Sequence, residues 1–540
     1  MPRILRAAAV VLLVVATAAC SDDDDGGSAP TADVELTATI DDHPVSAISA
    51  VLDITTDPPT PVAVTVDGPG GGFAIPATDA PRIPVVGMRA ESDYTITVTA
   101  GETTETLEWT TGALPDDLPP ISATVADPAR MQPGYTVFNA WSWDPVPEGE
   151  APSDAGYVIA VDGEGEVVWY QRLVHQVLDI DSTPRGTFLV TAGDVMIQEV
   201  DLLGTITREW GGRIAIGGED LAGRPFAHDD TLPLEIDSMH HEITELPNGN
   251  FVTLSTEMIE LDAADASRLC PEDPEPTIVG DVVVELAPDG AVVQEWPISA
   301  TFDPVEDPGA EMCIQGPPVA PPNWFYPESG LTRDWTHANA VEVHEDTNTL
   351  IVSLRHFDAI LALRYHDDDE GKAGELLWSL GTNGTLALDG EGPFHQHAMS
   401  LQDDGRLLMY DNGNLRPGTV LADGTAPPYS RAVIYQLDLE AGTATQVWDH
   451  RDTWADGRTI FTPFLGDADL VANGNVLITH GGGSTAEGNF QAKIVEVVPG
   501  DAPDGSADEV VFDLLIGDGT PVGWSSYRAM RLESLYFASE

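Results

Sequence analysis

A chain of 540 residues is too long for one ordinary domain, and its hydrophobic fraction of 42% is sufficient for large buried cores. It has 23 Lys and Arg residues against 90 Asp and Glu residues, which gives a formal net charge of -67. A charge of this sign and size repels nucleic acid and anionic lipid surfaces, so a role in binding nucleic acid is excluded. It is typical of a strongly solvated surface.

Residues 1–20 have the order of a secretory signal. Two arginines precede an apolar run, and the motif Thr17-Ala-Ala-Cys20 follows. This resembles a bacterial lipoprotein signal in which Cys20 carries the lipid, although plain secretion stays open because Thr17 replaces the usual Leu. Residues 21–32 include four consecutive Asp residues and predict a disordered tether. Because no later run is long and apolar enough to span a membrane, we expect an exported lipoprotein, either periplasmic or on the cell surface.

Cys270 and Cys313 are the two cysteines left after Cys20 is assigned to the lipid anchor. In an oxidising compartment, an isolated pair most simply forms a disulfide. The two lie far apart and lack the CxxC spacing of a metal site. We therefore expect a disulfide that closes a long insertion, and we expect no metal and no cofactor.

Short runs of alternating apolar residues between positions 33 and 112 predict a small β-sandwich of the fibronectin III or immunoglobulin-like type. The clearest runs are Val34-Leu36-Ala38, Val62-Val64-Val66 and Tyr94-Ile96-Val98. Tyr94 is similar to the tyrosine near a late strand of such sandwiches, and a plain strand tyrosine is the alternative. The Pro-rich segment 113–134 is then expected to be a linker.

Residues 135–540 contain a repeated β pattern. One half of the unit is a hairpin with a turn rich in Asp, Asn and Gly, as in the segments that begin at Leu246, Leu401 and Leu470. The other half is a pair of strands that ends in an aromatic residue, and it recurs six times: Trp169, Trp210, Trp296, Trp378, Trp448 and Phe512. Six endings with four strands each predict an all-β fold, a six-bladed β-propeller.

A sandwich or a β-helix is the alternative for such a pattern, but the spacing of the aromatic endings varies too widely for a regular solenoid. The segment from Ser525 to Tyr536 is one more strand-like run. It is placed to close the ring by pairing with the first blade, which would remove an exposed sheet edge.

Histidines recur at an equivalent position just before the first hairpin strand of three successive repeats. They are the pair His240 and His241, then His337, then His397. One histidine alone is usually structural, but three at one repeat position indicate a shared pocket. Arg355 follows an apolar strand and offers a planar fork of donors suited to sulfate, phosphate or carboxylate, with a surface salt bridge as the alternative. Asn339, two residues after His337, lies on the same strand face and is placed to orient the pocket or an anion.

Six motifs stand in a fixed order along the chain: His240-His-Glu-Ile, Asp334-Trp-Thr-His-Ala-Asn, Ser353-Leu-Arg-His, Gln396-His397, Asp411-Asn-Gly and Tyr527-Arg-Ala. Together they resemble the bacterial arylsulfate sulfotransferase family over about residues 135–536. The family's layout also includes a fibronectin-like module in front. The resemblance implies transfer of a sulfuryl group from one phenol sulfate to another phenol without a nucleotide donor, and no P-loop is found here.

The resemblance places His397 at the nucleophile, which would carry a transient sulfohistidine. It places His337, Arg355 and one of His240 and His241 around the sulfuryl oxygens. The implied partners are an aryl sulfate donor and a phenolic acceptor, while the oligomeric state is not specified. Two features depart from the family pattern: His395 could compete with His397, and the insertion 262–331 is long.

Two other functions stay open at this point. A propeller on the cell surface can be a non-catalytic module that binds a ligand or a partner. A metal-dependent hydrolase could use His337, His397 and the His240-His-Glu242 cluster as ligands. Arg355 discriminates between a metal site and a sulfate site, because a cation inside the histidine cluster opposes binding of a divalent ion and favours binding of a sulfate.

Overall fold

The structure, a computed structural model, describes residues 34–142 and 156–537, apart from 194, 220–224, 273, 276, 314–332, 382, 420–425, 485–489, 501 and 518–522. The predicted signal, the tether and Cys20 lie outside these residues. Regular structure in the described part of the chain is mostly β, with one α-helix, α1 (Ala263–Leu269), and short 3-10 turns. Over these same residues no helix is both long and apolar enough to cross a bilayer.

The N-terminal unit consists of two antiparallel sheets around one apolar core. One sheet has the strand order β1-β2-β5 and the other β4-β3-β6-β7. The strands are β1 (Glu35–Asp42), β2 (Ala50–Asp57), β3 (Val62–Asp67), β4 (Phe73–Thr78), β5 (Arg82–Val85), β6 (Asp93–Ala100) and β7 (Thr103–Thr110). The alternating apolar positions of β3 and β6 are buried, as the sequence predicts. The hydroxyl of Tyr94 accepts from the backbone N–H of Arg89 at 2.8 Å and donates to the carbonyl of Pro69 at 3.1 Å.

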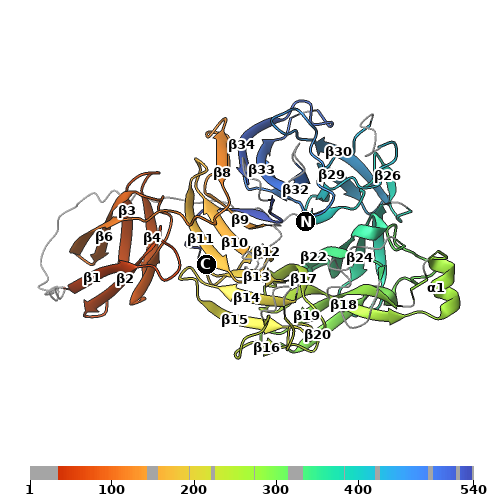
Figure 1. Ribbon diagram of the computed structural model, residues 1–540, viewed down its shortest axis with the longest axis horizontal. Helices are drawn as coiled ribbons and strands as arrows, with labels where there is room; N and C mark the ends of the chain where they lie inside the picture. The colour runs from red at the N-terminus through yellow and green to blue at the C-terminus, as the bar shows by residue number, and fades with distance from the viewer. Residues whose placement is uncertain are drawn as a thin grey trace, which may run out of the picture.

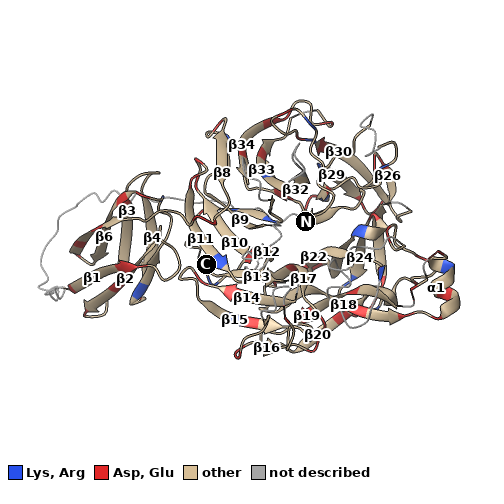
Figure 2. Cartoon of the chain, in the orientation of Figure 1, with Lys and Arg blue, Asp and Glu red and all other residues tan. Residues whose placement is uncertain are grey.

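This unit contacts the larger body directly (Figure 1). His43 Nε2 lies 2.9 Å from the carbonyl of Leu202. The backbone N–H of Ala47 donates to the Tyr170 hydroxyl at 2.9 Å, and that of Val86 donates to the Tyr536 hydroxyl at 2.7 Å. Acidic residues are spread over both units, whereas Lys and Arg are sparse (Figure 2). The unit is therefore packed against the body through specific polar contacts.

The larger body contains six sheets that follow one another around a centre (Figure 1). In chain order, the first three sheets have five strands each. They are β9 (Tyr135–Ser142), β10 (Gly156–Val161) and β11 (Val167–Leu173); β12 (Val177–Ser182), β13 (Phe188–Ala192), β14 (Met196–Val200), β15 (Ile206–Gly211) and β16 (Leu232–Pro233); β17 (His240–Glu245), β18 (Phe251–Glu260), β19 (Thr277–Leu286), β20 (Val292–Pro297) and β21 (Arg333–Asp334). Two C-terminal strands, described below, complete the first of them.

The last three sheets repeat the same hairpin order. They are β22 (Ala338–His344), β23 (Thr349–Leu354), β24 (Ala359–Arg364) and β25 (Leu376–Gly381); β26 (Ala387–Asp389), β27 (His397–Leu401), β28 (Arg406–Asp411), β29 (Arg431–Asp438) and β30 (Thr443–His450); β31 (Asp467–Leu470), β32 (Val476–Ser484), β33 (Phe490–Val498) and β34 (Glu509–Ile516). The first strands contact one another in the order β9, β12, β17, β22, β27 and β31. The innermost edge of every sheet therefore faces the centre.

The six aromatic residues that mark the repeats in the sequence occupy equivalent places in the structure. They lie on β11, β15, β20, β25, β30 and β34, the last of the successive hairpin strands in each sheet. All six are buried. The predicted hairpins also form, as β17-β18, β27-β28 and β31-β32.

The segment 113–134, expected to be a linker, contains β8 (Ile121–Val125), which is the outermost strand of the last sheet. It pairs antiparallel with β34, with Ala123 opposite Leu514. Its small and polar residues gave a weak strand pattern. The backbone of β34 nevertheless offers a free edge, and an added strand satisfies it.

The C-terminal segment pairs with the first sheet, as the sequence indicated. β35 (Trp524–Ser525) and β36 (Ala529–Leu532) both pair antiparallel with β9. Between them, the backbone N–H groups of Tyr527 and Arg528 donate to Asn139 Oδ1 at 3.0 and 2.9 Å. The two ends of the larger body are thereby joined.

Deletion of the chain from Ser525 onward should leave β9 without a partner on its inner side. We expect an aggregating product, or one whose melting temperature is at least 10 °C lower by the usual scaling of several degrees per kcal/mol. Thermal unfolding followed by circular dichroism measures this effect. A chain that lacks only residues 538–540 is the matched control, and a deletion variant that melts with the full chain would contradict the pairing.

Candidate active site

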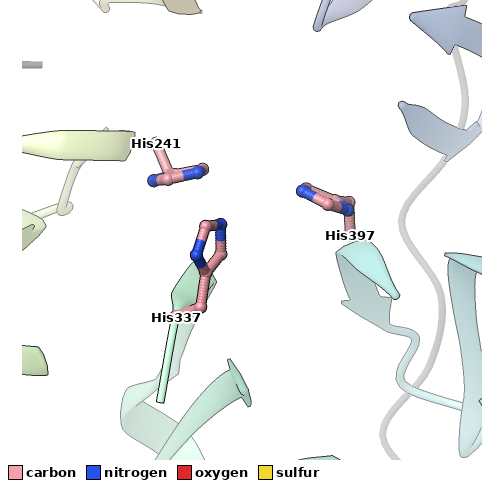
Figure 3. A group of neighbouring side chains, drawn as sticks. All are labelled: His241, His337 and His397. Atoms are coloured by element: carbon pink, nitrogen blue, oxygen red, sulfur yellow. The ribbon is translucent and has the colours of Figure 1, made fainter. Parts of the chain in front are cut away.

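Three histidines from neighbouring sheets meet at the centre of the larger body (Figure 3). One ring nitrogen of each of His241, His337 and His397 lies within 4.8 Å of the others. The ring centroid of His241 is 5.3 Å from that of His337 and 6.4 Å from that of His397. The convergence expected from the repeat position is therefore present in the structure.

A β-bulge at or next to each histidine turns its side chain toward the centre. The hairpin register shifts at Ile243, at Ala340 and at Met399, next to the three histidines. A residue at each of these bulges has a positive φ: His241 at 62°, His337 at 49° and Ala398 at 43°. β-Bulges re-aim side chains, and a positive φ is uncommon for residues other than glycine. Local strain at three equivalent points indicates a built site.

His241, rather than His240, belongs to the three-histidine group, a choice that the sequence left open. His240 is buried behind it, with Nδ1 2.8 Å from His241 Nδ1. On its other side, His240 Nε2 lies 3.3 Å from Asp281 and 3.4 Å from the carbonyl of Ser255. With two acceptors there, His240 carries its proton on Nε2, so His240 Nδ1 accepts a hydrogen bond from His241 Nδ1.

The hydrogen bonds around His397 fix its tautomer. Asn412 Nδ2 donates to the carbonyls of Thr462 and Leu465, at 2.8 and 2.7 Å. Asn412 Oδ1 must then be the atom that lies 2.7 Å from His397 Nδ1, and this oxygen only accepts. His397 therefore carries its proton on Nδ1. The lone pair of Nε2 is left free, which is the form of imidazole that attacks an electrophile.

Burial keeps this histidine neutral. It holds the pKa of His397 well below the ordinary value, and the positive charge of Arg355 lowers it further. Burial likewise lowers the pKa of His241, with added effects from the neighbouring histidines. Imidazole is nucleophilic above its pKa, so both rings keep an available lone pair at neutral and mildly acidic pH.

Replacement of Asn412 by Leu should remove the acceptor that selects the Nδ1–H tautomer. We expect the rate of the first chemical step to fall by roughly 10²-fold, because wrong-tautomer variants of hydrogen-bonded histidines lose a large part of their activity. Rapid-mixing measurement of phenol release gives this rate. Asn475→Leu is the control, because Asn475 is also buried but bonds Arg130 and Glu496. Equal losses in both variants would show that only stability had changed.

His337 is backed by a carboxylate. Its Nδ1 lies 2.5 Å from Asp334 Oδ2, and its ring centroid is 4.9 Å from that of His356. Burial would raise the pKa of Asp334, but interactions with the neighbouring His337 and His356 and with the charge of Arg355 outweigh it and hold this pKa below its usual range. The ionised carboxylate can balance a proton on His337, whose Nε2 then serves as a donor toward the centre.

Arg355 begins the turn η4 (Arg355–Phe357) directly after β23 and is 7% exposed. It donates from Nη1 to Glu311 at 3.0 Å and from Nη2 to the carbonyl of Pro463 at 3.1 Å. Its Nε–H has no hydrogen-bond partner among the residues that the structure describes. A buried guanidinium with an unused N–H beside the histidine group is suited to an anionic ligand.

Asn339 and His395 support the site without belonging to the three-histidine group. The Asn339 amide is fully buried and donates to the carbonyl of Gln396, the residue before His397, at 2.7 Å. His395 is outside the three-histidine group, and its Nδ1 lies 2.8 Å from Asp358. Burial alone would lower the pKa of His395, but hydrogen bonds to Asp358 and Glu311 raise it. A histidine that holds its proton is the weaker nucleophile of the two.

Tyr527 and Arg528 lie beside the histidines, and the sequence analysis assigned them no role beyond a shared motif. The Tyr527 ring centroid lies 6.0 Å from that of His241 and 5.8 Å from that of His397. Its hydroxyl donates to the carbonyl of Asn339 at 3.1 Å. The Arg528 guanidinium lies 4.4 Å from this ring and pairs with Glu242 and Asp467. The C-terminal segment therefore both joins the sheets and supports the histidines.

A cavity of about 450 Å³ beside Arg528 is lined by seven acidic side chains among apolar ones and lies apart from the three-histidine group. Burial raises the pKa of Asp179 to about 6 against the opposing charge of Arg528. Burial also raises the pKa of Asp181 to about 7. An acidic chamber of this kind repels anions, so the chemistry is assigned to the histidine cluster.

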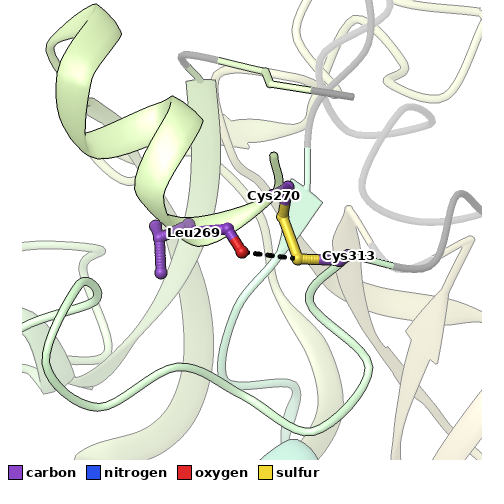
Figure 4. The surroundings of a disulfide bond; sticks show 3 residues. All are labelled: Leu269, Cys270 and Cys313. Carbon is purple, nitrogen blue, oxygen red and sulfur yellow. Dashed lines mark hydrogen bonds between the residues drawn. A yellow bond between two sulfur atoms is a disulfide. The ribbon is translucent and has the colours of Figure 1, made fainter. Parts of the chain in front are cut away.

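The insertion between β18 and β22 approaches the site on its Arg355 side. Cys270, at the C-terminal end of α1, forms the expected disulfide with Cys313 (Figure 4). Glu311, two residues before Cys313, is the carboxylate that pairs with Arg355. The predicted insertion 262–331 is interrupted by β19 and β20, two regular strands of the third sheet. Its last part, residues 314–331, lies outside the described part of the chain.

Within the described residues, two groups have the geometry to hold a metal ion: His241, His337 and His397, and Asp334, His337 and His356. Three neutral imidazoles are ordinary zinc ligands. The buried charge of Arg355 beside them opposes a divalent ion. The histidine ligands are therefore compatible with a metal ion, whereas the positive charge of Arg355 favours an anion.

The family model of the arylsulfotransferases (ASST) matches residues 124–512, which include the site residues named above except Tyr527 and Arg528. The chain belongs to this arylsulfotransferase family. Membership agrees with the resemblance that the motifs carry.

Two curated relatives are named arylsulfate sulfotransferase AssT. The protein of Escherichia coli O6:H1 (strain CFT073) is 24% identical over 389 residues, which is 62% of this chain and 59% of the relative. The protein of Lelliottia amnigena is 23% identical over 357 residues, 56% of this chain and 54% of the relative. The matched region therefore covers less than two thirds of the length of either relative.

Solved structures give weaker likenesses. A protein of unknown function from Bacteroides caccae has a TM-score of 0.31 and 14% identity, and the match covers 73% of this chain and 94% of that one. A putative 6-phosphogluconolactonase from Bacteroides uniformis has a TM-score of 0.33 and 10% identity, with coverage of 88% and 100%. These TM-scores are too low to support a conclusion about fold or function.

Proposed function

We propose that this chain is an aryl-sulfate sulfotransferase. It moves a sulfuryl group from a phenolic sulfate ester to a phenolic acceptor through a sulfohistidine on His397, without a nucleotide donor. The observation that carries the proposal is the fixed tautomer of His397, whose free Nε2 faces two further histidines with a buried arginine nearby. The family membership supports the same activity.

The first half-reaction is an in-line displacement at sulfur. The lone pair of His397 Nε2 forms an N–S bond while the S–O bond to the aryl group breaks, and the phenolate leaves with the bonding electrons. Arg355 stabilises the negative sulfuryl oxygens, and His337, with Asp334 as counter-ion, donates to them from Nε2. His241 completes the wall around the sulfuryl group.

The second half-reaction restores the enzyme. The oxygen of the acceptor phenol attacks sulfur, the N–S bond breaks, and its electrons return to His397 Nε2. The phenolic proton is released to a base or to solvent. Nδ1 keeps its proton on Asn412 throughout, so His397 leaves the cycle in the tautomer in which it entered.

We further propose that the six sheets form a closed six-bladed propeller with a fibronectin III-like sandwich docked against it. The pairing of β35 and β36 with β9 and the order of contacts among first strands support closure. Export as a lipoprotein anchored at Cys20 is supported by the order of residues 1–20 and by the Cys270–Cys313 disulfide.

Incubation with a chromogenic aryl sulfate, with and without a second phenol, tests the activity. We expect release of the chromogenic phenol to depend on the second phenol, with one equivalent of new aryl sulfate formed. Release to water alone would indicate a sulfatase. Stoichiometric bound metal together with loss of activity in a chelator would favour the metal-dependent hydrolase, for which the spacing of the three histidines is also suitable.

A further inference from the structure

Glu311 lies against the basic groups on one side of the site. Its Oε2 accepts from Arg355 Nη1 at 3.0 Å and lies 3.6 Å from His356 Nε2, and its Oε1 lies 3.5 Å from His395 Nε2. We propose that Glu311 sets the charge selectivity of the donor site, so that it accepts monoanionic sulfate esters and rejects dianionic phosphate esters. The inference rests on the proposed function and names a residue of its specificity.

The insertion holds Glu311 in place on both sides. The backbone N–H of Ala310 donates to the carbonyl of His356 at 2.7 Å, and Trp335 Nε1 donates to the carbonyl of Asp307 at 2.9 Å. Met312 is buried in an apolar cluster with Ile278 and Trp335. The disulfide at Cys313 follows directly (Figure 4). The carboxylate is thus positioned by its backbone rather than by one flexible salt bridge.

Glu311 places one negative charge directly beside Arg355. Arg355 is positive, and the His395 ring lies between Asp358 and Glu311, which raise its pKa against the effect of burial. Asp334 and Asp358 are negative, and burial keeps the pKa of His356 at about 3, so that ring is neutral. A hydrogen bond from His395 and the charge of Arg355 hold the pKa of Glu311 below its usual range. The carboxylate therefore offsets the positive charge of Arg355, the group assigned to the ester oxygens.

Sulfate and phosphate monoesters have the same shape and differ in charge. An aryl sulfate carries one negative charge, whereas an aryl phosphate carries two above its second pKa of about 6. A fixed carboxylate beside the site repels the dianion about twice as strongly as the monoanion, and the repulsion is large because the site is shielded from water. Glu311 therefore discriminates by charge where shape does not.

Calorimetric titration at pH 8 with benzenesulfonate and with phenyl phosphate tests this role, because binding of both probes can be measured without turnover. Glu311→Gln keeps the size and the hydrogen-bonding atoms and removes the charge. We expect it to raise the affinity for phenyl phosphate about 10-fold or more relative to that for benzenesulfonate. Glu311→Asp, which keeps the charge, should retain most of the wild-type preference.

Glu306→Gln is the matched control, because Glu306 lies on the same insertion and pairs with the exposed Arg268. It removes the same unit of net charge and should leave the preference unchanged. Equal changes in affinity for both probes in Glu311→Gln would overturn the inference, because they would indicate only a displaced Arg355. Failure of the wild-type protein to bind benzenesulfonate would also overturn it. A selective response in a protein that does not transfer sulfate would reject the proposed function and keep the role of Glu311.

Discussion

Replacement of His397 by alanine will abolish sulfuryl transfer and the initial release of phenol together. His397 supplies the only lone pair assigned to the first half-reaction, so the variant has no route to the covalent intermediate. We expect kcat to fall by at least about 10⁴-fold, the scale seen when a nucleophile is removed from a site that acts as a unit. Rapid-mixing kinetics with a chromogenic aryl sulfate measure both the burst and the steady state.

His228→Ala is the control for this substitution, because His228 is an exposed histidine that pairs with Glu209. It should transfer sulfate at the wild-type rate. Retention of the burst in His397→Ala would move the nucleophile to another residue, with His395 as the first candidate. An unchanged steady state without a burst would replace the two-step route with direct transfer between the two phenols.

Arg355→Lys will lower kcat/KM for the aryl sulfate by about 10²-fold while the protein stays folded. Lysine keeps the charge, but it cannot bond Glu311 and the carbonyl of Pro463 in one plane and still offer an N–H to the ligand. The loss should be mainly in kcat, because the interaction strengthens as charge develops on the sulfuryl oxygens. Steady-state kinetics at several donor concentrations separate kcat from KM.

Arg406→Lys serves as the control, since Arg406 lies at a surface turn and pairs with Asp404. Its kinetics and melting temperature should match those of the wild-type protein. A loss in Arg355→Lys that appears only in KM would show uniform binding of donor and transition state. No loss at all would remove Arg355 from the sulfuryl site.

The repeat was the strongest signal in the sequence. Each aromatic ending, such as Trp169 or Phe512, is a large buried residue in the second strand of a strand-turn-strand unit, and such a pattern depends on local strand and turn geometry. The convergence of His241, His337 and His397 followed from the same periodicity, since equivalent positions in successive repeats face the same centre. Local pattern and repeat symmetry together were sufficient for these features.

The features that the sequence did not predict depend on contacts between distant segments. Glu311 reaches Arg355 across 44 residues, and nothing in its neighbourhood distinguishes it from the many other acidic residues. The choice between His240 and His241 depends on a bulge that turns one ring to the centre. β8 was missed because its edge-strand sequence is short and polar, and its place is set by the free edge of β34.

The most direct test of the central proposal is mass spectrometry of the protein after rapid quenching with an aryl sulfate and no acceptor. Sulfohistidine is acid-labile, so the digestion is carried out at alkaline pH. We expect one added sulfuryl group, located on His397 and removed when a phenol is added before the quench. A sulfuryl group on His395, or transfer without any modified residue, would contradict the proposal.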